Sequence, residues 1–321
     1  MKITKASIQS YWDIVKSRFS IYLVLVGMII LAAIISPVFL SARNISNIAR
    51  QISVITIMAF GQTLVIIAGM IDLSVGSVMA LAGILSVSSY LATGSLFTAL
   101  LVGVIVGVIC STVNGLVVTK MKVPPFIATL GMLTAARGVA LLYTKGQNIY
   151  QIGDYVVWGQ GNIAGIPTPI LFMVGVAVVM WYSLNHTKFG RYTYAIGGNE
   201  EAARASGIKI DATKMKAFMV SGALVGLAGV LFMSRVNAGL PNAGIGYELD
   251  TISIAVIGGT SITGGTGTAT GTLAGAFIIG ILNNIMNLMG VQSYIQQVVR
   301  GAIIVLAVAY DSQAKKRRKT G

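Results

Sequence analysis

Residues 258–267 have the glycine and hydroxyl content of a phosphate-binding loop. Such a loop needs a Lys directly before a Ser or Thr, to neutralise phosphate charge and to bind magnesium, and no GxxxxGK[ST] sequence occurs anywhere in the chain. We therefore expect that the chain does not hydrolyse ATP. The glycines are better suited to letting backbones cross closely or to unwinding a helix at a turn, where threonine hydroxyls would satisfy the freed backbone groups.

Other reactive side chains are too isolated to catalyse a reaction. His186 has no Cys, Asp or Glu at the spacing of metal ligands, and no nucleophile is paired with a base in the sequence. The single cysteine, Cys110, cannot form an internal disulfide. We expect a non-catalytic chain that binds no metal and no cofactor.

Asp72 interrupts a long apolar stretch, between Gly69 and Ser77. A carboxylate in the middle of a membrane span costs about 2.5–3.5 kcal/mol, so its side chain should face protein or water. Because Ser74 and Gly76 follow it, Asp72 suits a cap on a tight turn that opens a helix. The alternative is a carboxylate of a translocation pathway or a proton relay. We favour the cap, since no second carboxylate lies nearby in the sequence to share a proton.

Three amides and two aromatic side chains inside apolar segments are candidates for a translocation pathway. An amide can hydrogen-bond the hydroxyls of a neutral, sugar-like solute, and an aromatic ring can stack on a sugar ring. The alternative, and the commoner use, is that the amides join one helix to another and the rings serve in packing. The candidates are Asn114, Phe126, Asn283, Asn284 and Tyr294.

The composition excludes an ordinary soluble protein. Of 321 residues, 55% are hydrophobic and only 10% are charged, whereas soluble domains use about 25% charged residues. So little polar surface cannot cover a globule of this length. The net charge of +14 alone would suggest nucleic acid as a partner, but a basic chain with so few polar residues points first to the lipid bilayer. We predict an all-α polytopic membrane protein.

Hydropathy predicts about ten transmembrane helices, because a bilayer core about 30 Å thick needs roughly 20 mostly apolar residues per crossing. The first span follows a basic stretch like that of a signal peptide, but no small-residue cleavage site follows, so we interpret it as a retained helix. The predicted spans lie at about residues 20–36, 52–70, 73–92, 96–119, 124–143, 169–184, 217–236, 251–264, 270–289 and 294–311.

Lys and Arg are concentrated in segments that ten crossings place on one side of the membrane. Four lie in the N-terminal tail, two follow the fourth span, six lie in the loop at 185–216 and five in the C-terminal tail, which accounts for 17 of 23. Cytoplasmic segments carry such an excess of positive charge. We predict cytoplasmic tails at 1–19 and 312–321, flanking a transmembrane domain at 20–311. RNA binding by the basic C-terminal tail is the less favoured alternative.

A short pattern occurs twice, once in each half of the chain. Asn within a span is followed, at nearly constant spacing, by Val-x-x-aromatic-Ile at the start of the next span. Five spans per half is an odd number, so the two halves would be inverted relative to each other, an arrangement that recurs in transporters. A chance match in apolar sequence is the alternative. The two copies are Asn114 with Val123 to Ile127, and Asn283 with Val291 to Ile295.

The loop at 185–216 is the longest polar segment, and it contains a short predicted helix. Asn199 suits an N-cap, and Glu200 and Glu201 would lie at the positive end of the helix dipole. Two alanines favour the helix and Gly207 ends it. A helix of about two turns is hardly stable alone, so it should pack against something. A capped surface helix and a docking site for a partner protein are both consistent with this pattern.

This loop resembles the EAA-x-x-x-G loop of ABC-importer permeases, through Glu201-Ala202-Ala203 and Gly207. The surrounding Gly197-Gly198-Asn199 and Ser206-Gly207-Ile208 sharpen the match, as do residues 69–77, 126–131 and 246–250. Together these motifs resemble the monosaccharide permeases, specifically the ribose-type permeases, over nearly the whole chain.

The resemblance implies a permease subunit, in a bacterial inner membrane, that translocates ribose or a similar simple sugar. It implies three protein partners: an ATPase subunit with tandem nucleotide-binding domains, an extracytoplasmic sugar-binding protein, and a second, identical permease chain. The segment that would couple to the ATPase comprises Asn199, Glu200, Glu201, Ala202, Ala203 and Gly207. Candidate contacts for the sugar-binding protein are Arg43, Arg50 and Arg235.

The main alternative is an ion-coupled secondary transporter of a small polar solute. Such proteins also contain inverted repeats, but they usually need intramembrane carboxylates to bind the coupling ion. Asp72, Glu248 and Asp250 keep this alternative open.

Overall fold

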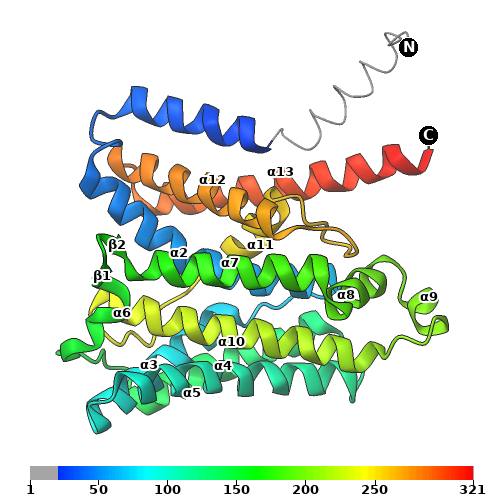
Figure 1. Ribbon diagram of the computed structural model, residues 1–321, viewed down its shortest axis with the longest axis horizontal. Helices are drawn as coiled ribbons and strands as arrows, with labels where there is room; N and C mark the ends of the chain where they lie inside the picture. The colour runs from blue at the N-terminus through cyan, green and yellow to red at the C-terminus, as the bar shows by residue number, and fades with distance from the viewer. Residues whose placement is uncertain (1–20, 321) are drawn as a thin grey trace.

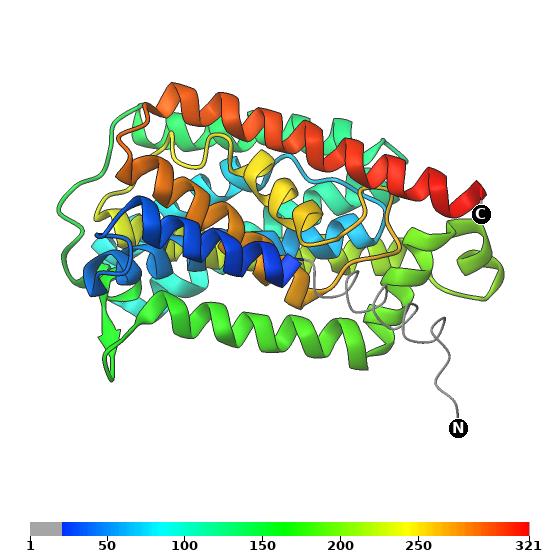
Figure 2. The same cartoon turned by 90° about the horizontal axis from the view of Figure 1, so that it is seen from above.

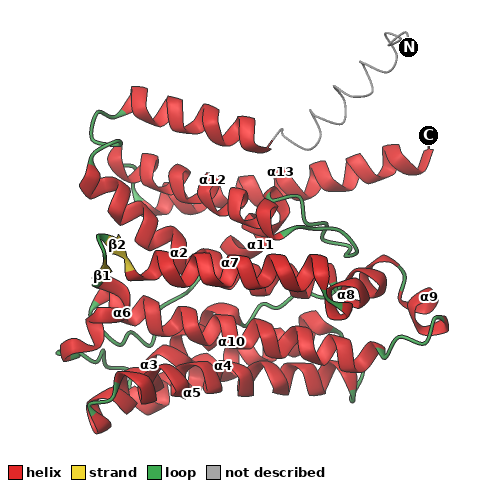
Figure 3. Ribbon diagram, viewed as in Figure 1, coloured by secondary structure: helices red, strands yellow, loops and turns green. Residues whose placement is uncertain are grey.

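The fold is a bundle of long helices with one short hairpin (Figures 1 and 3). The computed structural model describes residues 21–320, so the predicted N-terminal tail at 1–19 lies outside the described residues. Seven described helices are long and apolar enough to cross a membrane, which confirms an all-α polytopic architecture. They are α2 (Ala42–Ile67), α3 (Val75–Thr93), α4 (Leu96–Thr119), α5 (Pro125–Thr144), α7 (Thr168–His186), α10 (Ile210–Val236) and α12 (Ala269–Leu288).

Three further helices correspond to the remaining predicted spans. A helix at Ile21–Ile35 covers the first, and α13 (Ser293–Thr320) covers the tenth and continues through most of the predicted C-terminal tail. The eighth, expected at 251–264, is α11 (Tyr247–Ile257). Its 11 residues extend about 16 Å, half of a bilayer core. The helix ends there because Gly258 and Gly259 follow it, and Gly259 has φ +85°, outside the helical region.

Smaller elements cover the two ends of the bundle. At one end lie η1 (Gly153–Val156), α6 (Val157–Gln160) and an antiparallel hairpin of β1 (Asn162–Ile163) and β2 (Ile166–Pro167). At the opposite end, α8 (Lys188–Gly198) and α9 (Glu200–Ala205) project beyond the bundle (Figure 1). The last residues of α13 lie at the same end as α8 and α9 (Figure 2).

Helix α2 lies at the centre, where it packs against α7, α10, α11 and α12. In its most apolar stretch of 18 residues, 83% of the residues are buried, whereas in that of α5, at the periphery, 17% are buried. Helices α4 and α10 cross without side chains between them: a Cβ added at Gly107 would overlap the carbonyl oxygen of Gly222, and one at Gly226 would overlap that of Gly103. Small residues four apart allow this close approach, which gives membrane helices their van der Waals contact.

Candidate coupling and translocation sites

The predicted loop helix is α9, and its ends form as the sequence indicates. The Oδ1 of Asn199 accepts a hydrogen bond of 2.9 Å from the backbone N–H of Ala202, so Asn199 is the N-cap. At the other end Gly207 has φ +80°, and the N–H of Ile208 donates to the carbonyl of Ala203 over 3.1 Å. This is the pattern in which a left-handed glycine ends a helix. Both the cap and the stop are confirmed.

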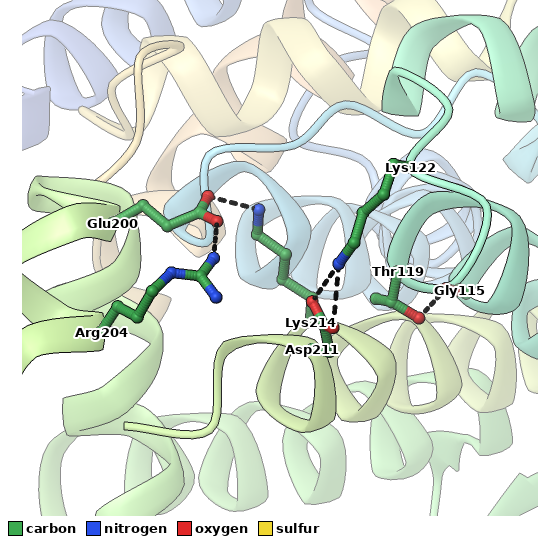
Figure 4. A network of polar contacts seen from close by, with 7 residues as sticks. All are labelled: Gly115, Thr119, Lys122, Glu200, Arg204, Asp211 and Lys214. Carbon is green, nitrogen blue, oxygen red and sulfur yellow. Dashed lines mark hydrogen bonds and ion pairs between the residues drawn. The ribbon is translucent and has the colours of Figure 1, made fainter. Parts of the chain in front are cut away.

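One ion pair, between Glu200 and Lys214, attaches α9 to the start of α10 (Figure 4). Glu200 accepts from Lys214 over 2.6 Å and from Arg204 over 3.1 Å. The hydrogen bond from Lys214 is the largest cause that holds the pKa of Glu200 below its ordinary value. Just before Lys214, Asp211 accepts from Lys122 over 2.9 Å, and Lys122 lies in the turn between α4 and α5. The loop is therefore linked both to α10 and to the turn that leads into α5.

The residues of α9 divide into an inner and an outer face. Ala203, which the sequence placed among the partner-contacting residues, is only 4% exposed and packs with Ile196 and Ile210. Glu201 and Ala202 are exposed. Ala203 thus holds α9 to the loop beneath it, and an α-helical period of 3.6 residues leaves its two preceding neighbours on the outer surface.

Asp72 is fully buried in the turn between α2 and α3. Its Oδ1 accepts from the backbone N–H of Ser74 over 2.8 Å and from the Ser74 hydroxyl over 2.6 Å. The amide of Asn114, in α4, donates to the same hydroxyl over 3.0 Å. The Asp72 carboxylate therefore stabilises the predicted tight turn, but the N-cap residue of α3 is Ser74, which makes no side-chain cap hydrogen bond. Asn114 joins α4 to the same turn.

The five pathway candidates do not converge on one site. Asn283 accepts from Arg300 over 3.3 Å, and Asn284 exchanges hydrogen bonds of 2.9 and 3.1 Å with Asn44, so both amides join helices. Phe126 and Tyr294 are 55% and 78% exposed. They begin α5 and α13, and those two helices start at opposite ends of the bundle (Figure 1).

Charged side chains that sequence reasoning did not assign to the pathway occur on α5, α11 and α13, and we call this group the charged face; it comprises Arg137, Glu248, Asp250 and Arg300. Arg300, about two turns into α13, pairs with Asp250 of α11 at 3.2 Å. Arg137, in the middle of α5, donates to the carbonyl of Pro241 just before α11. The sequence indicated these residues only by placing single charged residues within apolar segments.

Glu248 lies where two helices begin. Its Oε1 accepts from the N–H of Gly246 over 3.2 Å, directly before α11. A Cβ added at Gly76, in the first turn of α3, would lie 2.6 Å from its Oε2. The carboxylate of Glu248 therefore lies between the first turns of α3 and α11.

The three arginines proposed to contact a binding protein differ in their exposure. Arg43 is exposed at the start of α2. Arg50 donates to Asn162 of the hairpin over 3.0 Å, and Arg235 lies 5.5 Å from the ring centroid of Phe232. The last two are partly enclosed because their guanidinium groups contact their own fold.

A bundle of helices long and apolar enough to cross a membrane defines a polytopic membrane protein. The chain belongs to the family described as branched-chain amino acid transport system / permease component, whose model matches residues 44–308. Permease components of this kind are non-catalytic membrane subunits. The match covers all seven of the long apolar helices except the first two residues of α2.

Relatives that align over nearly their full lengths are sugar permeases by name. The chain is 43% identical to the ribose import permease protein of Bacillus subtilis (strain 168), over 94% of each chain. It is 43% identical to that of Escherichia coli (strain K12), over 90% of this chain and 92% of the relative. The L-arabinose transport system permease protein of Escherichia coli (strain K12) is 36% identical, over 96% and 93%. No solved structure matches the chain.

Proposed function

We propose that this chain is the permease subunit of an ATP-binding-cassette importer that carries a monosaccharide, ribose or a similar simple sugar, into the cytoplasm. The observation that carries the proposal is α9: a capped helix of six residues, held to the bundle by Ala203 and Glu200, with Glu201 and Ala202 turned outward. The names of the relatives favour a sugar over the amino acids of the family description.

The outer surface of α9 is the contact for a separate ATPase with tandem nucleotide-binding domains. Glu200 anchors the helix to α10 through Lys214, so a push on α9 reaches a helix that is 27 residues long and runs the length of the bundle. The buried Ala203 keeps α9 from moving alone. Asn199 and Gly207 set its ends, so that all six predicted residues serve the coupling, four of them by shaping or anchoring the helix.

The charged face is the surface that a second, identical permease chain completes. Arg137, Glu248 and Arg300 are each partly exposed, and a charge in contact with lipid at such depth costs about 2.5–3.5 kcal/mol. Helices α5 and α13 lie on the same side of the bundle in Figure 2, and Figure 1 shows that they lie apart from each other on that side. Helix α11 packs against α13. A water-filled pathway between two copies gives these charges, together with Phe126 and Tyr294, a polar environment.

The chain crosses the membrane ten times as two inverted five-helix repeats, with both termini in the cytoplasm of a bacterial cell and the protein in its inner membrane. Helices α3 and α11 are the third elements of the two halves, and each follows an irregular turn after a long helix. The first turn of α3 meets the segment before α11 at Gly76 and Gly244, as expected if the repeats are related by an axis in the membrane plane. Helix α11 crosses only together with the irregular segments on either side of it.

Arg43 is the candidate for docking an extracytoplasmic sugar-binding protein, through carboxylates of that protein. Its exposure at the hairpin end, opposite α8 and α9, supports this role. Arg50 and Arg235 contribute less because their guanidinium groups contact Asn162 and Phe232. Charge reversal at Arg43 should reduce ATP hydrolysis stimulated by the binding protein, whereas reversal at Arg50 should change it less.

A cysteine cross-link tests the coupling surface. In a chain with Cys110→Ala, Ala202→Cys should cross-link to a co-expressed ATPase subunit, while Ala203→Cys should not, because Ala203 is buried. Sugar uptake into proteoliposomes that contain both subunits and the binding protein should require ATP. Uptake driven by a proton or sodium gradient without the ATPase would instead establish the ion-coupled transporter.

A further inference from the structure

The glycine-rich loop at 258–268, which resembles a phosphate loop only in composition, lies against the loop that carries α9. It begins where α11 ends and finishes at Thr268, the N-cap of α12. Its internal hydrogen bonds include the N–H of Ser261 to the carbonyl of Thr266, at 3.1 Å, and the N–H of Gly264 to the carbonyl of Ser261, at 2.9 Å. These hydrogen bonds restrain the conformation of the loop.

Three backbone segments meet without side chains between them at the glycine junction, defined by Gly69, Gly197, Gly264 and Gly265. The N–H of Gly265 donates to the carbonyl of Ile67, the last residue of α2, over 2.9 Å. A Cβ added at Gly197, near the end of α8, would overlap that same carbonyl oxygen. A Cβ at Gly264 would lie 3.0 Å from the Cα atoms of both Gly197 and Gly69. The close packing leaves no space in which α8 could shift without moving its neighbours.

A side chain reinforces this contact. The hydroxyl of Tyr194, in α8, donates to the carbonyl of Gly267 over 2.7 Å. Burial raises the pKa of the Tyr194 phenol above its ordinary value. Gly198, by contrast, has open space where a Cβ would lie. Two residues after Gly197 comes Asn199, the N-cap of α9, so little chain separates the junction from the proposed ATPase contact.

Beyond the junction, the loop leads to the charged face. Ile262 of the loop packs against a buried cluster formed by Ile66 of α2 and by Ile252, Ala255 and Val256 of α11. Helix α11 carries Asp250, whose carboxylate pairs with Arg300 of α13. A displacement of α8 would therefore reach the pathway through one loop and one short helix.

We propose that the loop at 258–268 transmits the movement of α9 to α11, with Gly197 and Tyr194 as positioning residues that couple ATP hydrolysis to sugar transport. This proposal rests on the proposed function. It adds a second route by which movement of α9 reaches the bundle, besides the Glu200–Lys214 ion pair with α10. The loop binds no phosphate in this role. Its glycines are required because two other backbones occupy the space of side chains.

The test compares Gly197→Ala with Gly198→Ala in the complete transporter, with its ATPase and binding protein, in proteoliposomes. Gly197→Ala should retain basal ATP hydrolysis and the Ala202→Cys cross-link to the ATPase. Sugar transported per ATP should fall about fivefold or more, because the added methyl group overlaps the Ile67 carbonyl oxygen and displaces its hydrogen bond with Gly265. Gly198→Ala should stay near the unsubstituted protein. Equal transport per ATP in the two variants would overturn the proposal.

Tyr194→Phe decides the question if Gly197→Ala fails to fold, because it removes a single hydroxyl. It too should lower transport per ATP by about fivefold with basal hydrolysis retained. A thiol-reactive probe at Ile245→Cys, an exposed position before α11, should show a smaller ATP-dependent change in labelling rate in this variant. An unchanged response would overturn the proposal. Absence of the ATPase cross-link in the Cys110→Ala, Ala202→Cys chain that carries neither Gly197→Ala nor Tyr194→Phe would instead refute the proposed function itself.

Discussion

The ion pair between Arg300 and Asp250 can be tested with a double-mutant cycle. The side chain of Asp250 is 6% exposed, that of Arg300 is 31% exposed, and their nearest atoms lie 3.2 Å apart. At an effective dielectric constant of about 20, two charges at this distance attract by about 5 kcal/mol, and desolvation offsets much of that. The single variants Asp250→Asn and Arg300→Met therefore measure the cost of leaving one partner alone.

Removing one member of a buried pair costs about 3–5 kcal/mol, and the structure predicts which variant costs more. Arg300→Met strands the nearly buried carboxylate of Asp250. Asp250→Asn leaves Arg300 more exposed and still bonded to Asn283, so this loss should be smaller. The double variant has no stranded charge, and its loss should fall short of the sum of the two by about 1–3 kcal/mol.

The assay is equilibrium unfolding in mixed micelles, with the free energy of unfolding measured for all four proteins under identical conditions. Purification as a monodisperse peak controls for aggregation. If the losses of the single variants add in the double variant to within about 0.5 kcal/mol, the two side chains do not interact, and the reasoning about the charged face is refuted.

Three further predictions concern packing, capping and titration. Gly107→Ala should destabilise the α4–α10 crossing by about 1–3 kcal/mol through overpacking. Gly175→Ala, at an open helical position, should stabilise the protein by up to about 1 kcal/mol. The same unfolding assay would contradict this if the two variants changed the free energy of unfolding in the same direction. Asn199→Ala should weaken ATPase binding by roughly fivefold through loss of a cap worth about 1 kcal/mol, with Asn199→Asp close to unsubstituted in pull-down. The contribution of Glu200 to the free energy of folding should be complete above its ordinary pKa of 4.5 and disappear as pH falls through its lowered pKa. Lys214→Met should raise the pKa of Glu200 in a carboxylate NMR titration, and an unchanged pKa would exclude the pairing.

Charges and irregular backbone occur together at α11. Its 11 residues leave irregular backbone on both sides within the bundle, and such backbone is tolerated at membrane depth only where it is buried in protein or lines a cavity. The same short helix carries Glu248 and Asp250 and receives Arg300. The interrupted helix, the charged face and the glycine-rich loop are therefore parts of one arrangement.

The sequence by itself determined the class of architecture, the capped helix and the turn at Asp72. Apolar runs identify membrane helices because the bilayer core excludes unbonded backbone. The ends of α9 were predictable because Asn199 and Gly207 act on backbone groups within a few residues. Those interactions are local, so their signals are local as well.

Only the tertiary structure decided which side chains meet. Asn114 and Asn284 looked alike as pathway amides, yet one joins Ser74 and the other joins Asn44, because partners 40 and 240 residues away in the chain are set by helix packing. The hydropathy of 251–264 predicted a span, whereas the paired glycines at its centre ended α11. The sequence assigned the glycine-rich loop to close backbone crossing or to unwinding a helix, but only the fold showed which backbones meet, by placing Gly197 against Ile67 and Gly265. Contacts between distant segments depend on how helices pack, and that information is not contained in any single stretch of sequence.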